Sequence, residues 1–361
     1  MKVLIVGAGA GGMSAAAELA LAGHEVSLWN RSADTLAPIL SARGIGYEGV
    51  LGSGRIPLDL VTTDISRAML KAEVTVVTLP TFTHIDVAQT LASAGWGNKR
   101  PILLNPGHTG GALEFARAYA KHGEVPPIAE FNTLTYVARK YSPDVVTVSG
   151  RAKGFRAASL AGGGAALDLA VRLFPGAQVV KDVLYTDLCN LNMVLHAPGS
   201  ILAVGWVEAR KGDFTFYVDG MTPGIVRVMR ELDDERRRVG AAFGHDLLSV
   251  VDEMKIVGTV DPDADSSDFV ACIAGGEANK KIKAPDSLSH RYYKEDFGHG
   301  LVPFIDLARI AGVETPTADS LLHLANVVCN LDFRAGGRTA TSMGISGLSK
   351  DELLRKVRQE R

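Results

Sequence analysis

The sequence predicts an α/β fold in which a doubly wound, mostly parallel sheet is followed by an all-α domain. Through the first half of the chain, short apolar runs typical of strands alternate with runs of helical spacing, and this rhythm favours a parallel sheet. After about residue 185 the alternation stops, and apolar residues recur at three- and four-residue intervals. We therefore expect one domain over residues 1–185 and a second, helical domain over residues 186–361.

The composition is that of an ordinary globular protein, and it argues against several classes of function. Hydrophobic residues make up 47% of the 361 residues, and the formal net charge of −2 gives no electrostatic support for binding nucleic acid. No stretch reaches about 18 uninterrupted apolar residues, so we expect no membrane span, and we expect no signal peptide ahead of the first apolar run. The three cysteines lie far apart, which argues against a disulfide framework or a metal site and suits the cytoplasm.

A glycine-rich turn follows the first apolar run with the spacing of a dinucleotide-binding motif. Residues 2–6, "KVLIV", are typical of a buried strand, and the alanine-rich run from Met13 is a good helix former. Between them, Gly7, Gly9 and Gly12 satisfy G-x-G-x-x-G. The first glycine permits the turn, the second lets a pyrophosphate approach the backbone, and the third lets the helix pack closely on the strand. We predict a Rossmann-type, cofactor-binding sheet; the alternative is a glycine-rich turn without a ligand.

The end of the second predicted strand, "HEVSLWNRS" (24–32), indicates which cofactor is bound. An acidic residue there would bond the ribose 2′-hydroxyl of NAD, but the tip here is Asn30-Arg31-Ser32. The guanidinium of Arg31 suits a 2′-phosphate, and Ser32 offers a further hydroxyl. We therefore predict NADP rather than NAD, while an ordinary surface arginine is the alternative for Arg31.

The rest of the first half continues the alternation. We expect strands in 72–80 and 101–107, helices over 84–94 and from about 110, and strand-like runs at 134–139 and 144–149 that extend the sheet. A helix near 164–174 leads to a last strand around 178–184. The strand end "TLPTFTH" places Pro80 at the carboxyl edge of the sheet, where such folds bind their ligands. In "NPGHTGGALEF" (105–115), a second glycine-rich turn, free N–H groups are expected to face the nicotinamide or a substrate carboxylate, which makes His108 and Thr109 candidate substrate-binding residues. The alternative is a tight loop that needs a positive φ.

The second half carries the start signals of several helices. Thr222 with Pro223, Thr315 with Pro316, and Ser349 each stand at a preferred helix start. The segment 258–270 is acidic and loop-like. A cleft between the nucleotide domain and this helical domain is the economical place for an active site.

The stretch "NLNMVLHAPG" (190–199) begins the second domain with a helix that places two polar side chains on one face. Thr186 or Asp187 can cap this helix, and Pro198 is expected to kink or end it. Asn192 and His196 then share a face with Cys189. From the spacing alone, His196 is either a proton carrier or a buried structural histidine.

Taken together, the motifs resemble those of the opine dehydrogenase family, which includes octopine and nopaline dehydrogenases and, most similar, bacterial N-(1-carboxyethyl)norvaline-type enzymes. The resemblance spans essentially the whole chain and is carried by "VGAGAGG", "NPGHTGGALEF", "NLNMVLHAPGSIL", "YVDGMTPGI", "RYYKEDFGHGLVP" and "DFRAGGRTATSMGISGLS". It implies a two-domain enzyme that reductively condenses an α-amino acid with an α-keto acid, using NAD(P)H, and that also catalyses the reverse oxidation. Both substrates are small molecules.

The same resemblance implies roles for four residues of the second half. The family's catalytic histidine and aspartate correspond to His196 and Asp296, a proton carrier and the carboxylate that fixes its tautomer. Asn192 corresponds to a binding asparagine, and Arg291 to an arginine that clamps a carboxylate, with a structural salt bridge as its alternative. This chain departs from the family at the tip of strand two, where relatives carry an acid, and at His108, where they have a smaller residue.

Two other functions remain as alternatives at this stage. One is a two-domain dehydrogenase that reduces a ketone, like ketopantoate reductases or glycerol-3-phosphate dehydrogenases, which rely on a catalytic lysine. The other is a catalytically silent NADP-binding sensor, which would not need His196, Asp296, Asn192 and Arg291 together. For the oligomeric state, a homodimer is one alternative.

Overall fold

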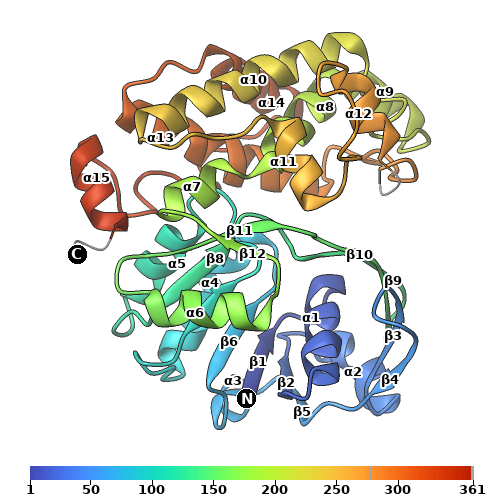
Figure 1. Cartoon of the computed structure of the whole chain (residues 1–361), viewed down its shortest axis with the longest axis vertical. Helices are drawn as coiled ribbons and strands as arrows, with labels where there is room; N and C mark the ends of the chain where they lie inside the picture. Colours follow the sequence, from blue (N-terminus) through green and yellow to red (C-terminus); the bar gives the residue numbers. More distant parts are fainter. Residues whose placement is uncertain (277–278, 359–361) are drawn as a thin grey trace. The chain divides into compact units, whose positions relative to one another are not determined.

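The computed structural model describes residues 1–276 and 279–358, which divide into two compact units. The first unit comprises Met1–Gly107 and Gly111–Val183 (Figure 1). The second comprises His108–Gly110 together with the described residues from Leu184 onward. The short segment 108–110 thus belongs by its contacts to the helical unit, although it lies within the first half of the sequence.

The first unit is built on an eight-stranded sheet that is mostly parallel, as the alternation in the sequence predicts. Its order is β12-β11-β8-β7-β6-β1-β2-β5, and only the β8–β11 pair is antiparallel. The central strands are buried because both faces are covered, so their sequences are mostly apolar. The strands are β1 (Lys2–Val6), β2 (Glu25–Trp29), β5 (Leu60–Thr62), β6 (Val74–Val77), β7 (Ile102–Leu104), β8 (Ile128–Phe131), β11 (Phe155–Ser159) and β12 (Ala177–Val179).

A second sheet corrects the prediction that the runs at 134–139 and 144–149 extend the first. These runs form the antiparallel pair β9 (Tyr136–Ser142) and β10 (Val145–Arg151). They join β3 (Ile45–Gly49) and β4 (Gly54–Ile56) in a separate four-stranded sheet of order β4-β3-β10-β9. The prediction was wrong because alternation shows that a strand forms but not which strand it pairs with.

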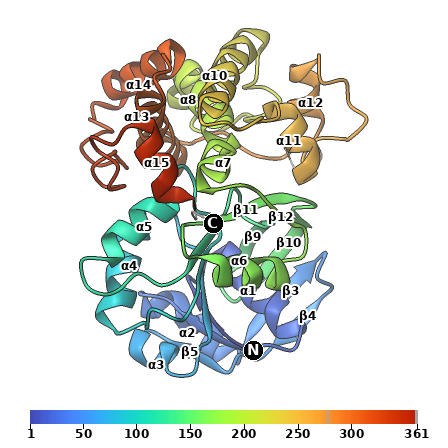
Figure 2. The ribbon, with the colours of Figure 1, turned by 60° about the vertical axis from the view of Figure 1, so that its left-hand side comes forward.

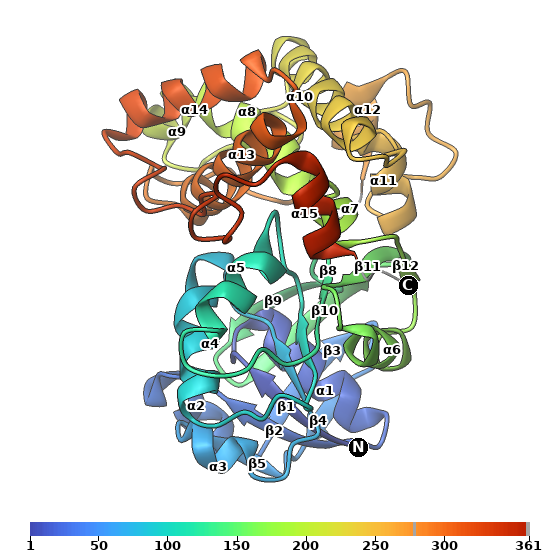
Figure 3. The ribbon, with the colours of Figure 1, turned by 90° about the vertical axis from the view of Figure 1, so that its left-hand side faces the viewer.

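Helices connect the strands of the first unit at the expected places. The glycine-rich turn leads into α1, and α4 lies beside α5 (Figure 3). The predicted last strand at 178–184 is shorter than expected: β12 ends at Val179, and Val183 already begins α7. The helices of this unit are α1 (Ala10–Leu21), α2 (Ala33–Ser41), α3 (Ile65–Met69), the 3₁₀-helix η1 (Thr81–Thr83), α4 (His84–Ser93), α5 (Gly111–Tyr119) and α6 (Gly164–Leu173).

The second unit is helical, and α8, α10, α13 and α14 pack against one another at its centre (Figure 2). The expected helix starts are confirmed: Pro223 and Pro316 begin α10 and α14, and Ser349 forms a capping box with Glu352 at α15. The helices are α7 (Val183–Leu188), α8 (Leu191–Leu202), α9 (Val204–Arg210), α10 (Pro223–Ala242), α11 (Val250–Val257), α12 (Phe269–Gly275), the π-helix η2 (Tyr293–Leu301), α13 (Val302–Ala311), α14 (Pro316–Cys329) and α15 (Lys350–Val357).

The helix that carries His196 differs from its prediction at both ends. Asn190 is the N-cap of α8, whereas Thr186 and Asp187 lie in α7, so neither caps α8. Cys189 precedes α8 and does not share its face. Pro198 does not end the helix, which continues to Leu202, because the buried residues from Met193 to Ile201 hold it in place by packing.

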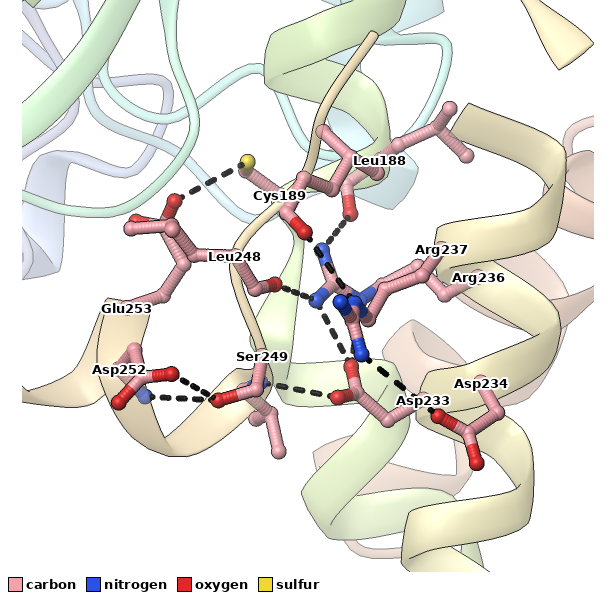
Figure 4. A network of polar contacts seen from close by, with 12 residues as sticks. Leu188, Cys189, Asp233, Asp234, Arg236, Arg237, Leu248, Ser249, Asp252 and Glu253 are labelled. Carbon is pink, nitrogen blue, oxygen red and sulfur yellow. Dashed lines mark hydrogen bonds and ion pairs between the residues drawn. The ribbon is translucent and has the colours of Figure 1, made fainter. Parts of the chain in front are cut away.

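A buried ion pair holds the turn between α7 and α8 (Figure 4). The fully buried Arg236 of α10 pairs with Asp233, its Nε lying 2.7 Å from Oδ1. Its guanidinium also donates to the carbonyl oxygens of Leu188, at 2.9 Å, and Leu248. The buried guanidinium of Arg236 thus has a carboxylate and two carbonyl oxygens as hydrogen-bond partners, as a buried charge requires. These bonds fix the turn that precedes Asn190.

Among the described residues, no single helix is long and apolar enough to cross a membrane. The segments Val183–Leu202 and Val204–Arg210 are long and apolar enough only when they are counted as one, and the chain bends by 67° between them.

Candidate active site

The glycine-rich turn of the first unit has the geometry that a dinucleotide needs. Gly7 has a φ of 116°, a backbone conformation that residues with a side chain rarely adopt. A Cβ on Gly12 would lie 1.8 Å from the carbonyl oxygen of Gly7, so only glycine lets α1 come this close to β1. A Cβ on Gly9 would meet nothing within 4 Å, which leaves room for a ligand against the backbone. The first turn of α1 holds no acidic residue, and no side chain caps it, so its N–H groups are suited to an anion.

The three residues at the tip of β2 are placed differently from one another. The side-chain oxygen of Asn30 accepts a hydrogen bond from the backbone N–H of Ala8 at 3.2 Å, so Asn30 braces the glycine turn. Ser32 caps α2 by accepting from the N–H of Thr35. Arg31 is exposed and makes no ion pair within 1–276 and 279–358, which leaves its guanidinium available to an incoming anion. Pro80, also exposed, follows β6 at the start of η1.

In the second unit, the structure brings together the histidine and aspartate that lie 100 residues apart. The Nδ1 atom of His196, on α8, lies 2.8 Å from Oδ2 of Asp296, on η2. Both side chains are buried, with exposed fractions of 6% and 2%. The carboxylate accepts the hydrogen bond from Nδ1–H, which leaves Nε2 as the acceptor nitrogen of the neutral ring.

Tyr217 occupies the other side of the histidine, a contact that no sequence reasoning anticipated. Its hydroxyl lies 2.7 Å from Nε2 of His196. Burial raises the pKa of Tyr217 well above its ordinary value, so the hydroxyl keeps its proton and donates it to Nε2. The ring of Tyr292 stacks on the imidazole, with centroids 3.8 Å apart and planes at 13°. Asp296, His196 and Tyr217 thus form one buried hydrogen-bonded chain, with the ring plane fixed by Tyr292.

The two predicted substrate-binding residues on or next to the same helices are less buried than His196 and Asp296. Asn192 is half-buried on α8, and Arg291 is exposed just before η2. The Arg291 guanidinium is 4.0 Å from the carboxyl of Glu295, too far for a strong bond, so it can turn to a substrate carboxylate. Burial raises the pKa of Glu295 to about 7; Arg291 opposes this rise and Asp296 adds to it.

The segment 108–110 contributes to the same cluster. His108 has a φ of 61°, is partly exposed, and bonds to the side chain of Asn190. Burial lowers its pKa to about 4, so the ring is neutral at physiological pH, even though the Asp296 carboxylate acts in the opposite direction.

Thr109 is fully buried and has a structural role in its observed contacts. Its hydroxyl donates to the carbonyl oxygen of Asp187 and accepts from the amide of Asn190, both at 3.1 Å. Arg338, also fully buried, donates to the carbonyl oxygen of Thr109 at 2.7 Å. Thr109 therefore anchors the turn that presents His108, and its role in binding a substrate stays a prediction.

Sequence reasoning missed Tyr217, Asn190 and Arg338, although signals for them existed. Tyr217 begins "YVDGMTPGI" and Arg338 lies in "DFRAGGRTATSMGISGLS", two of the segments that carry the family resemblance. In the described part of the chain, no group of three or more His, Cys, Asp or Glu side chains could hold a metal ion. What the cluster offers is proton transfer at a histidine and charge recognition by an arginine.

Family models match both parts of the chain. Residues 179–329 match the model described as NAD/NADP octopine/nopaline dehydrogenase, alpha-helical domain. Residues 3–120 match the model described as ketopantoate reductase PanE/ApbA.

Individual proteins extend the similarity over the full length. The chain is 33% identical over 349 residues to an opine dehydrogenase of Arthrobacter sp. (strain 1C), covering 96% of this chain and 95% of that one. Among solved structures, octopine dehydrogenase in complex with NADH and agmatine has a TM-score of 0.80 at 20% identity, covering 100% of this chain and 99% of that one. Yersinopine dehydrogenase bound to NADP⁺ has a TM-score of 0.72 at 13% identity, covering 98% and 97%.

Proposed function

Since the chain belongs to the opine dehydrogenase family, we propose that it catalyses the NADPH-dependent reductive condensation of an α-amino acid with an α-keto acid, and the reverse oxidation. The product is an N-(carboxyalkyl)amino acid, formed through an imine. The observation that carries the proposal is the 2.8 Å contact between His196 and Asp296, inside the segment that matches the family's helical domain.

The residues of this cluster suit the proton transfers that the reaction needs. The amine attacks the keto carbonyl to give a carbinolamine, which loses its hydroxyl group and a proton from nitrogen as water to form the imine. After reduction at carbon, the nitrogen of the product must end protonated. A histidine that gains or gives up a proton at Nε2 serves these steps, and such catalysis typically contributes about 10²–10⁴ in rate. Asp296 keeps the ring in the tautomer with its proton on Nδ1 and supports the imidazolium when it forms.

A nicotinamide dinucleotide fits the first unit, and when bound it supplies the hydride that reduces the imine carbon. The open space at Gly9 and the uncapped first turn of α1 suit its pyrophosphate. We infer a preference for NADPH because Arg31, exposed and without an ion-pair partner in the described residues, offers a positive charge where NAD enzymes carry an acid. Structural neighbours include complexes with NADH and with NADP⁺.

Two small carboxylate-bearing molecules are the proposed substrates. Octopine dehydrogenase has been solved with L-arginine and with pyruvate, an amino acid and a keto acid. In this chain, Arg291 is the proposed clamp for one carboxylate, with Asn192 and the neutral ring of His108 as further hydrogen-bonding groups. We expect neither nucleic acid nor membrane as a partner, and we propose the cytoplasm as the site of action.

One spectrophotometric assay separates this function from its alternatives. Protein, NADPH, a keto acid and a panel of amino acids are mixed, and the loss of NADPH absorbance is followed, with NADH in parallel. Oxidation that requires both substrates supports the opine dehydrogenase reaction. Oxidation with the keto acid alone would instead indicate a ketone reductase, and none with any pair would indicate a sensor. A clear preference for NADH would overturn the cofactor assignment.

A further inference from the structure

Lys140 lies beside the glycine-rich turn, although none of the cofactor motifs includes it. It stands on β9, and β9 packs against α1, the helix that follows the turn. Its Nζ donates to the carbonyl oxygen of Ala8 at 3.4 Å. Ala8 is the second residue of the G-x-G-x-x-G motif, and its own N–H donates to Asn30 at the tip of β2. The peptide groups of Ala8 are therefore held by Asn30 on one side and by Lys140 on the other.

The strand that carries Lys140 is tied to α1, so the position of the ammonium is set by the fold. Glu18, on α1, accepts a hydrogen bond from the hydroxyl of Tyr136, at the start of β9. The same carboxylate pairs with Arg151, at the end of β10. Both strands of the hairpin are thus fixed to α1, whose N-terminus is the proposed site of the dinucleotide. Support by fixed secondary structure is what keeps a binding residue in position.

Among the described residues, no carboxylate forms an ion pair with the ammonium of Lys140. The side chain is half-buried, and burial lowers its pKa. Asp144 is the acid that opposes this shift, but its carboxylate is already engaged: Arg55 lies 2.6 Å from one oxygen and the hydroxyl of Ser142 lies 2.8 Å from the other. Within the described ranges Lys140 makes no ion pair. A partly desolvated cation with only a carbonyl partner is stabilised when an anion arrives.

We propose that Lys140 binds a phosphate group of the nicotinamide dinucleotide, as a point charge that complements the N–H groups at the start of α1. The proposal rests on the nicotinamide cofactor of the proposed function. Two phosphates fit this chemistry: the pyrophosphate, which NADH and NADPH share, and the 2′-phosphate, which only NADPH carries. Lys140 contacts Ala8, which belongs to the proposed pyrophosphate turn and is hydrogen-bonded to Asn30 at the tip of β2, so its side chain lies near the expected place of either phosphate.

The test is direct binding, measured by calorimetric titration of NADPH and of NADH into the full-length protein, without substrates. Lys140→Met is compared with wild type, with Lys140→Arg, which keeps the charge, and with Lys153→Met, which removes an exposed lysine of the same unit. We expect Lys140→Met to raise the Kd for NADPH about tenfold or more, as loss of a charged hydrogen bond does, while the other two variants stay within about threefold of wild type. Thermal unfolding verifies that all variants are folded.

The two cofactors distinguish the two phosphates. A rise in Kd for both NADPH and NADH assigns Lys140 to the pyrophosphate, and a rise for NADPH alone assigns it to the 2′-phosphate. If Lys140→Met binds both cofactors as wild type does, the inference is overturned while the proposed function stands. If the wild-type protein binds neither cofactor, the proposed function itself fails and the inference falls with it.

Discussion

The Nδ1 atom of His196 lies 2.8 Å from Oδ2 of Asp296, and the two residues come from separate helices, α8 and η2. The approach is possible because these helices pack directly together and because Gly300, on η2, leaves no room for a side chain: a Cβ there would lie 2.9 Å from Cβ of Met193. The aspartate sits in a π-helical segment, a conformation that is rare and often found at functional sites. A buried carboxylate bonded to a buried imidazole is the arrangement that a proton-transferring histidine needs.

The first prediction concerns the histidine itself. His196→Ala is expected to lower kcat by about 10²–10⁴, because the proposed proton carrier is lost. Asp296→Asn is expected to lower kcat as well, because an amide at this position favours the imidazole tautomer that carries its proton on Nε2. The Kd for NADPH is expected to stay nearly unchanged in both variants, since the cofactor motif lies in the other unit. Steady-state kinetics and direct titration measure the two quantities. Retention of wild-type turnover by His196→Ala would refute the assigned role.

The second prediction concerns Tyr217, whose hydroxyl donates to the nitrogen that would act on substrate. Tyr217→Phe keeps the ring and removes only the oxygen. We expect kcat to fall about tenfold, the equivalent of one hydrogen bond of about 1.4 kcal/mol, with little change in the thermal midpoint. An unchanged or higher kcat would mean that Tyr217 only occupies Nε2 in the free protein and is displaced by substrate.

Features formed by residues close together in the sequence were predictable, whereas features that join distant residues were not. The cofactor turn was predictable residue by residue, because Gly7, Gly9 and Gly12 act within six positions of one another. The second sheet was not, since β10 pairs in parallel with β3, about a hundred residues earlier, and alternation carries no information about pairing partners.

The site follows the same division. The contact between His196 and Asp296 was expected only through resemblance to a family, because no local pattern links residues 100 positions apart. Sequence reasoning missed Asn190, Tyr217 and Arg338, because a sequence does not reveal which polar residues are buried or which hydrogen-bond partners they have. Of the two effects expected of Pro198, an end to the helix is wrong, because tertiary packing outweighed a local preference.

The third prediction tests the buried ion pair shown in Figure 4. Arg236→Met is expected to reduce the free energy of unfolding by about 3–5 kcal/mol, because it leaves the buried carboxylate of Asp233 without its cation. The double variant Asp233→Leu/Arg236→Met is expected to recover part of this loss, since no charge is then left buried. Arg238→Met, at an exposed position of the same helix, is expected to change stability by less than about 0.5 kcal/mol. Urea unfolding measures all three; a loss no larger than that of the control would contradict the prediction.

The fourth prediction follows from the pKa of Glu295, which burial raises from 4.5 to about 7. Between these values the folded protein keeps a proton that the unfolded chain releases, so the free energy of unfolding falls as pH rises from about 4.5 to about 7. The full loss, reached above the folded pKa, is on the order of 3 kcal/mol. Glu295→Gln carries no titrating proton and escapes this loss, so its stability relative to wild type is expected to rise over that pH range and then level off. Thermal or urea unfolding from pH 4.5 to 8.5 tests this, with Glu314→Gln, at an exposed position, as the control. A difference between variant and wild type that does not change with pH would show that the pKa of Glu295 is the same in the folded and the unfolded protein, and would contradict the prediction.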